Sequence, residues 1–84
     1  MQMPDAATEA RLTRKERQLL EILIRNAGAA VPKSFLLRSV WQYSEEAKTR
    51  TVDVHIQRLR RKLGPRHGAA IKTIVGSGYS WLPG

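Results

Sequence analysis

The sequence predicts a mainly α domain with a small C-terminal β-hairpin, an α+β fold of three helices followed by two strands. Three observations predict this fold. Apolar residues recur at helical spacing in three separate segments before residue 64. Two short β-rich runs then follow, separated by a glycine-containing loop. The length of 84 residues suits one domain, and the absence of cysteine excludes a disulfide framework and a cysteine-based zinc site.

Basic residues dominate the charge, and they gather in the second part of the chain. The sequence holds 15 Lys and Arg against 7 Asp and Glu, which gives a net charge of +8. Residues 1–49 carry a net charge of +2, whereas residues 50–84 carry +6. Such one-sided charge favours a polyanionic partner, with nucleic acid ahead of an anionic membrane surface.

No secretory signal is recognisable in the first residues of the sequence. Residues 1–5 lack the basic and apolar regions of a secretory signal peptide, and no apolar run approaches the roughly 18 residues of a membrane span. We therefore expect a cytoplasmic protein with no membrane partner. Residues 1–11 are predicted to form a flexible lead-in that could end in a short strand, followed by one domain over residues 12–84.

The first predicted helix spans about residues 14–27. Thr13 and Glu16 match a capping box, in which each side chain accepts a hydrogen bond from the other residue's backbone amide. Leu12 precedes the cap, in the position of a hydrophobic staple, and Gly28 suits a helix end. The helical spacing is carried by Leu19, Leu20, Leu23 and Ala27.

The second predicted helix spans about residues 33–41. It begins after Pro32, whose fixed φ suits a helix entrance. Its apolar stripe consists of Leu36, Leu37, Val40 and Trp41. Residues 42–48 lack periodicity and are predicted to form a loop.

The third predicted helix, over about residues 50–63, has the clearest pattern. Thr49 is its predicted cap, and Gly64 with Pro65 is predicted to end it. We expect its apolar face to pack on a core and its basic face to be offered to an anion. The apolar face consists of Val52, Ile56, Leu59 and Leu63. The opposite side carries Arg50, Val54, Gln57, Arg58 and Arg61.

The C-terminal segment predicts a hairpin. Two β-rich runs, residues 71–75 and 79–82, flank a three-residue loop of sequence Gly-Ser-Gly. This loop is not a nucleotide-binding loop, because a strand rather than a helix follows it.

The third helix matches the dimensions of DNA. The major groove of B-DNA is about 12 Å wide and accepts a helix about 10–12 Å across. Arg58 suits a bidentate pair with guanine, Gln57 suits adenine, and Val54 suits a thymine methyl group. Neutralising four to six phosphates would give roughly −4 to −5 for the slope of log K against log salt. The predicted phosphate contacts of this helix are Arg50, Thr51, Arg60, Arg61 and Lys62.

The segment from Thr49 to Gly64 closely resembles the recognition helix of OmpR/PhoB-type response-regulator effector domains, which are winged helix-turn-helix domains. The resemblance extends over roughly residues 12–82. It includes LTRKE at 12–16, LLRSVW at 36–41, IKT at 71–73 and GSGY at 76–79.

This resemblance implies a bacterial, DNA-binding transcription regulator of the two-component type. Its recognition helix would enter the major groove with Val54, Gln57 and Arg58 at the bases, and its hairpin wing would approach the backbone or the minor groove. The backbone contacts that it implies are Trp41, Arg50, Arg60, Thr73 and Tyr79, to which we add Lys72 of the wing.

The resemblance also implies protein partners. In this family the loop between the second and third helices can touch RNA polymerase, which makes Glu45 and Glu46 the candidate contacts. Many members bind direct repeats as tandem dimers.

The chain departs from the family pattern in three places. Val75 stands where the wing usually carries an arginine aimed at the minor groove, and Pro32 stands where the second helix usually has a capping Ser or Thr. Residues 1–11 cannot supply the antiparallel sheet that precedes the first helix, so this sheet is expected to be missing or reduced. The receiver domain is absent too. The chain is thus a fragment or a stand-alone regulator, and Met1 slightly favours the second.

Several residues have a structural alternative. Trp41 suits the core better than a contact, Tyr79 either seals the wing or donates its hydroxyl outward, and Asp53 suits a structural role near the helix start. His55 and His67 are too isolated for a metal site, and no catalytic group is recognisable. We therefore expect no enzyme, no metal and no cofactor.

Two other functions compete with sequence-specific DNA binding. One is a protein-interaction module that holds RNA polymerase or another regulator. The other is an architectural DNA binder whose affinity does not depend on sequence.

Overall fold

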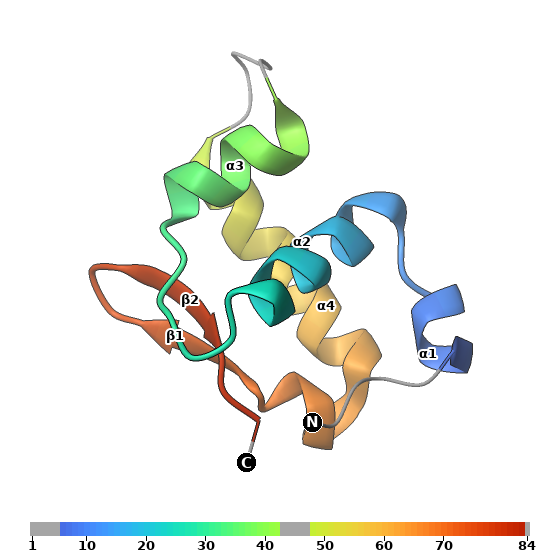
Figure 1. The fold of residues 1–84 in the computed structure, drawn as a ribbon. Helices are drawn as coiled ribbons and strands as arrows, with labels where there is room; N and C mark the ends of the chain where they lie inside the picture. The colour runs from blue at the N-terminus through green and yellow to red at the C-terminus, as the bar shows by residue number, and fades with distance from the viewer. Residues whose placement is uncertain (1–5, 43–47, 84) are drawn as a thin grey trace.

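The computed structural model describes residues 6–42 and 48–83 (Figure 1). The elements in chain order are α1 (Ala6–Ala10), α2 (Arg14–Arg25), α3 (Lys33–Trp41), α4 (Thr49–Gly68), β1 (Ile71–Ile74) and β2 (Gly78–Trp81). The prediction of three helices followed by a hairpin is confirmed for α2, α3, α4 and the two strands. The five-residue helix α1 occupies the place where a short strand was expected, and that expectation is wrong.

The capping box at the start of α2 forms as predicted. The Glu16 carboxylate accepts from the backbone amide of Thr13 at 2.8 Å, and the Thr13 hydroxyl accepts from the amide of Glu16 at 3.2 Å. Leu12 is buried beside them. The helix ends at Arg25, two residues before the predicted end. Asn26 follows it with non-helical angles, φ −108° and ψ 30°, and its side-chain amide donates to the Ile22 carbonyl oxygen at 2.7 Å.

Helix α3 has the predicted bounds. Pro32 occupies its N-cap position with an extended backbone and makes no side-chain cap. The predicted loop 42–48 lies mostly outside the described residues, apart from Gln42 and Lys48.

Helix α4 differs from its prediction at both ends. Lys48, not Thr49, occupies the N-cap position, and the Thr51 hydroxyl accepts from the Lys48 amide at 3.4 Å. Gly64 leaves helical geometry with φ 85° and ψ 174°, so the straight helix does stop there. Instead of becoming a loop, however, the chain makes one further turn through Pro65 to Gly68.

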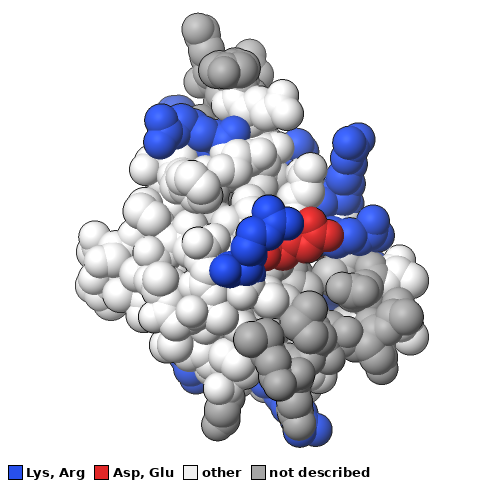
Figure 2. Space-filling model, in the orientation of Figure 1, with Lys and Arg blue, Asp and Glu red and all other residues white. Residues whose placement is uncertain are grey.

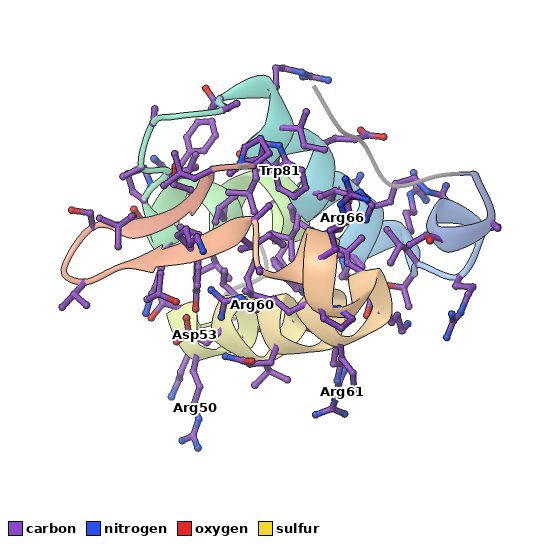
Figure 3. The ribbon with its side chains drawn as sticks, turned by 90° about the horizontal axis from the view of Figure 1, so that it is seen from below. Arg50, Asp53, Arg60, Arg61, Arg66 and Trp81 are labelled. Carbon is purple, nitrogen blue, oxygen red and sulfur yellow. The ribbon has the colours of Figure 1, made fainter. Side chains whose placement is uncertain are left out.

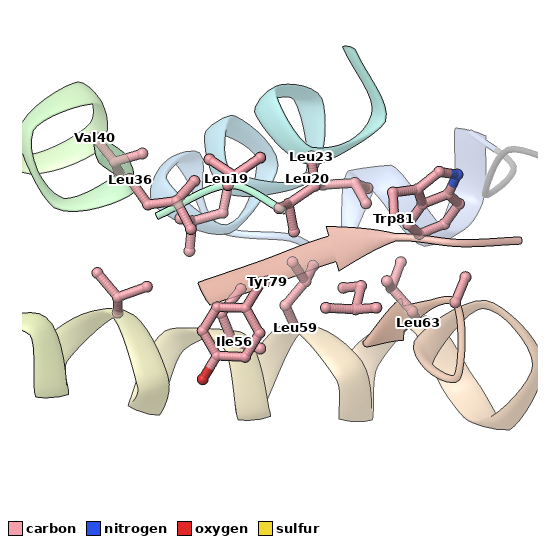
Figure 4. Packing of buried hydrophobic residues seen from close by; sticks show 14 of the residues in the cluster. Leu19, Leu20, Leu23, Leu36, Val40, Ile56, Leu59, Leu63, Tyr79 and Trp81 are labelled. Atoms are coloured by element: carbon pink, nitrogen blue, oxygen red, sulfur yellow. The ribbon is translucent and has the colours of Figure 1, made fainter. Parts of the chain in front are cut away.

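The core lies between the three long helices and one face of the hairpin (Figure 4). Helices α2 and α3 face α4, and β2 runs between them with Tyr79 and Trp81 pointing inward. The apolar stripes predicted for the helices supply most of this cluster, including Leu19, Leu20, Leu23, Leu36, Val40, Val52, Ile56, Leu59 and Leu63.

The hairpin, here called the wing (residues 71–81), is tied to the α2–α3 connection. Its strands pair antiparallel, with Thr73 opposite Tyr79. Val31 exchanges two backbone hydrogen bonds with Tyr79, at 2.7 and 3.1 Å. Gly78 has φ 142°, and a Cβ there would collide with the Val31 carbonyl oxygen, so only glycine fits.

Over residues 6–42 and 48–83, the only sheet is the two-stranded wing. The expectation that the preceding sheet is missing or reduced concerns residues 1–11, of which the structure describes Ala6–Ala10 as helix α1. Among all the described residues, no helix combines the length and apolar character needed to cross a bilayer.

Candidate nucleic-acid interface

Helix α4 has four sides with different surroundings: an inner stripe, an outer stripe, and two flanks between them. The inner stripe is buried in the core. The outer stripe, which consists of Arg50, Val54, Gln57, Arg58 and Arg61, is exposed along its whole length. Figure 3 shows Arg50 and Arg61 projecting from the side of α4 that faces away from the rest of the molecule. The prediction that this side is turned outward is confirmed.

None of these five side chains makes a hydrogen bond or an ion pair with another described residue. Val54 is 41% exposed although its side chain is apolar. The outer stripe thus combines three guanidinium groups, one amide and one small apolar side chain on a rigid helix.

The flank of α4 that faces the wing carries Arg60. Its guanidinium donates to the carbonyl oxygen of Ile71 through Nη2 and Nε, at 2.8 and 3.1 Å, and through Nη2 to the Thr73 hydroxyl at 2.9 Å. Arg60 also lies 5.5 Å from the centre of the Tyr79 ring. Arg60 therefore fastens β1 to α4, which the sequence did not predict.

Asp53 lies on the same flank, two turns before Arg60. Its carboxylate accepts a 2.5 Å hydrogen bond from the Tyr79 hydroxyl and lies 3.0 Å from the Lys33 ammonium group. Burial acts to raise the pKa of Asp53, but the hydrogen bonds from Tyr79 and Lys33 and the charge of Lys33 outweigh it and lower the pKa. Burial, reinforced by the bond to Asp53, raises the pKa of Tyr79 to about 12.

The structural alternative for Tyr79 is the one that the structure shows. The residue is 3% exposed, and the proton of its hydroxyl is used by Asp53. In this arrangement Tyr79 seals the wing against α4 and does not donate outward. The structural role expected for Asp53 is also found, and its partners are Lys33 and Tyr79.

The opposite flank of α4 faces α2 and α3. Lys62 donates to the Glu16 carboxylate at 2.8 Å, and Glu16 is only 1% exposed. Lys62 therefore neutralises a buried charge, and its predicted phosphate contact does not fit this position.

Trp41 and His55 meet on this flank. Their rings lie edge to face with centroids 4.8 Å apart, and the Lys15 ammonium group lies 5.3 Å from the Trp41 ring centre. His55 Nδ1 lies 2.9 Å from the Thr51 carbonyl oxygen. Trp41 is half-buried, so it packs against the core with part of its surface open.

An open groove runs between the outer stripe and the wing. Gln57, Arg61, Lys72 and Thr73 are among its lining residues, and all four are exposed. The groove thus joins one predicted base contact, Gln57, to predicted phosphate contacts on α4 and the wing. On the face shown in Figure 2, by contrast, basic side chains stand in separate groups beside a small acidic patch.

The structure brings together most, but not all, of the predicted site. Val54, Gln57, Arg58, Arg50, Arg61, Lys72 and Thr73 share one exposed region. Glu45 and Glu46 lie outside the described residues. The sequence predicted a structural role for Asp53 and the capping box of Glu16, but it missed their long-range partners, which are Lys33 and Tyr79 for Asp53 and Lys62 for Glu16. The signal at Asp53 was that it is the sole acidic residue after position 49.

Comparison with known proteins identifies the family. Residues 7–81 match the family described as "Transcriptional regulatory protein, C terminal". The transcriptional regulatory protein HprR of Escherichia coli is 43% identical over 72 residues, which cover 84% of this chain and 32% of HprR. ResD of Bacillus subtilis is 40% identical over 80 residues, which cover 92% of this chain and 33% of ResD. The chain thus spans about a third of the length of these relatives.

Solved structures show the same fold. The DNA-binding domain of Bacillus subtilis CssR superposes with a TM-score of 0.75 at 33% identity, over 86% of this chain and 78% of that one. The DNA-binding domain of Klebsiella pneumoniae RstA, solved in complex with the RstA box, gives 0.74 at 31% identity, over 87% of this chain and 74% of that one. This is a family of transcription-factor domains and not of enzymes. The chain belongs to the OmpR/PhoB-type winged-helix DNA-binding domains of response regulators.

Proposed function

We propose that this chain binds DNA in a sequence-specific manner to regulate transcription, with α4 in the major groove and the wing on the neighbouring backbone. One observation carries the proposal: the outer stripe of α4 is exposed and basic, and its side chains make no hydrogen bond or ion pair with other described residues. The solved complex of the related RstA domain with its DNA box supports this function.

In this proposal some residues of the outer stripe contact bases and others contact phosphates. Arg58 pairs with guanine O6 and N7, Gln57 pairs with adenine, and Val54 contacts a thymine methyl group. Side chains at the edges of the stripe and on the wing contact phosphates and so set the register without reading bases. These phosphate contacts are Arg50, Arg61, Lys72 and Thr73, with Thr51, Trp41 and one remaining nitrogen of Arg60 beside them.

Further partners follow from the family. The proposal includes a bacterial cytoplasmic location, tandem dimers on direct repeats, and contact of Glu45 and Glu46 with RNA polymerase. It also keeps residues 12–84 as the DNA-binding domain.

Replacement of Arg58 by alanine tests the proposal. A duplex is first selected from a random-sequence library with the unmodified chain. Arg58→Ala should weaken binding to this duplex by about 1–3 kcal/mol and relax the preference at one base position. The control is Arg25→Ala, which removes the same charge from an exposed site on α2. No selected duplex, or equal affinities for the two variants, would refute sequence-specific binding through α4.

One observation favours a second candidate, a protein-interaction module. Val75 at the tip of the wing is 92% exposed, and its apolar side chain offers neither a charge nor a hydrogen bond to a phosphate. A complex with RNA polymerase that survives joint replacement of Arg58 and Arg61, and is lost when Glu45 and Glu46 are changed, would support this candidate over DNA binding.

A further inference from the structure

Asp53 is out of place in a surface that binds DNA. It is the only acidic residue among positions 50–84, which otherwise carry seven basic residues. Its side chain is 37% exposed, so its negative charge lies at the surface beside the outer stripe of α4. A carboxylate in this place repels phosphates. If Asp53 weakens DNA binding through its charge, it must also favour DNA binding in another way that offsets this repulsion.

The contacts of Asp53 attach other elements to α4. The carboxylate joins three elements, because it accepts from the Tyr79 hydroxyl of β2 at 2.5 Å and pairs with Lys33 at the start of α3 at 3.0 Å. Lys33 also lies 5.7 Å from the centre of the Tyr79 ring. Asp53 thus fixes the second strand of the wing against α4.

Arg60 completes the same device on the first strand. It lies seven residues after Asp53 and so on the same side of α4. Through its bonds to Ile71 and Thr73 it holds β1, and Thr73 pairs with Tyr79 across the strands. The two attachments from α4 therefore meet at one rung of the wing, next to the exposed side chains of Lys72 and Thr73.

We propose that Asp53 is a positioning residue for DNA binding: with Arg60 it holds the wing at a fixed distance from the outer stripe, so that Lys72 and Thr73 meet phosphates beside the groove that α4 enters. This inference rests on the proposed function. Asp53 itself touches no DNA, and it acts through Tyr79.

The change in DNA affinity on removal of Asp53 distinguishes the positioning role from the alternative that the Tyr79 hydroxyl binds DNA directly. If the Tyr79 hydroxyl served DNA directly, removal of Asp53 would release it and also remove a repulsive charge, and binding would tighten. If Asp53 positions the wing, its removal weakens binding although the net charge becomes more positive. A simple charge argument predicts the opposite result.

The experiment uses the duplex selected with the unmodified chain and compares Asp53→Ala with Glu21→Ala. Glu21 is exposed on α2, so its variant makes the same change of charge away from the wing. Asp53→Ala should bind about three- to tenfold more weakly than Glu21→Ala, which corresponds to the loss of one or two hydrogen bonds. Its hydroxyl-radical footprint should lose protection on the wing side and keep it where α4 lies.

Equal or tighter binding by Asp53→Ala, or a uniform loss of the whole footprint, would overturn the inference. If thermal unfolding shows that Asp53→Ala does not fold, Asp53→Leu is compared with Glu21→Leu, because leucine fills the place of the carboxylate but cannot accept the hydrogen bond from Tyr79. Weaker binding by the leucine variant at position 53 supports the positioning role, and equal or tighter binding overturns it. If the unmodified chain selects no duplex, the proposed function fails. If only Arg58→Ala loses binding, this inference alone fails.

Discussion

Glu16 joins two distant parts of the chain through one carboxylate. Its Oε1 atom accepts from the Thr13 amide, which closes the capping box, and also from Lys62 on α4 at 2.8 Å. Burial acts to raise the pKa of Glu16, but the bonds from Lys62 and Thr13 and the charge of Lys62 outweigh it and lower the pKa. The ionised side chain is thus part of the folded structure.

This lowered pKa predicts an acid-dependent stability. The unfolded chain takes up a proton on Glu16 more readily than the folded chain does, so the contribution of Glu16 is complete above the ordinary value of 4.5 and is lost as the pH falls through the folded value. Glu16→Gln should lower the free energy of unfolding at pH 7 by about 1–3 kcal/mol and reduce the loss between pH 5 and 3. Urea unfolding across this range provides the measurement. An unchanged acid profile, judged against the exposed control Glu21→Gln, would contradict this account.

For single residues, the sequence predicts contacts between residues that are close in the chain. The bond between Thr13 and Glu16 spans three residues and has a known pattern, so it could be predicted. The pair of Glu16 with Lys62 spans 46 residues and depends on how α2 packs on α4. For the same reason the sequence assigned Lys62 to phosphate, although its basic neighbour Arg61 does point outward.

The positions of the helices could be predicted from the spacing of apolar residues, whereas the exact ends of the helices depend on tertiary contacts. The apolar stripe of α4 predicted which side is buried, and the outer stripe followed from it. The turn after Gly64 could not be predicted in this way, because it is stabilised by close packing. A Cβ on Gly68 would lie 2.5 Å from the Arg60 carbonyl oxygen, so this turn rests directly on the backbone of α4.

The glycines of the wing differ in what they do, and this predicts unequal effects of alanine. Gly76 has φ 79°, and a Cβ added there would meet no atom within 4 Å, whereas a Cβ added at Gly78 would collide with the backbone of Val31. Gly76→Ala should cost about 1 kcal/mol through backbone strain alone. Gly78→Ala should cost about 3 kcal/mol or more, because the strand must also move away from Val31. Urea unfolding of both variants tests the difference, and equal losses would show that the contact between Val31 and the wing does not constrain the fold.

The whole molecule has fewer basic groups available for DNA than its composition indicates. The net charge of +8 predicted a polyanionic partner, and the family bears out DNA as the relevant one. However, Lys62 is paired with Glu16, Lys33 with Asp53, and Arg60 is attached to the wing. The exposed basic groups of α4 and the wing that remain near the groove are Arg50, Arg58, Arg61 and Lys72.

This distribution predicts the salt dependence of binding. About three or four phosphates would be neutralised, by Arg50, Arg61, Lys72 and the remaining nitrogen of Arg60. The slope of log K against log salt should therefore be roughly −3 to −4, at the shallow end of the range expected from composition. Lys72→Gln should reduce the magnitude of this slope by about 1, because it removes one phosphate contact. Arg25→Gln removes the same charge from α2, outside the groove, and should leave the slope unchanged. Binding of the selected duplex by each variant, titrated from low to high salt, tests both statements. If the two variants shift the slope equally, binding responds to net charge and not to the arrangement of α4 and the wing.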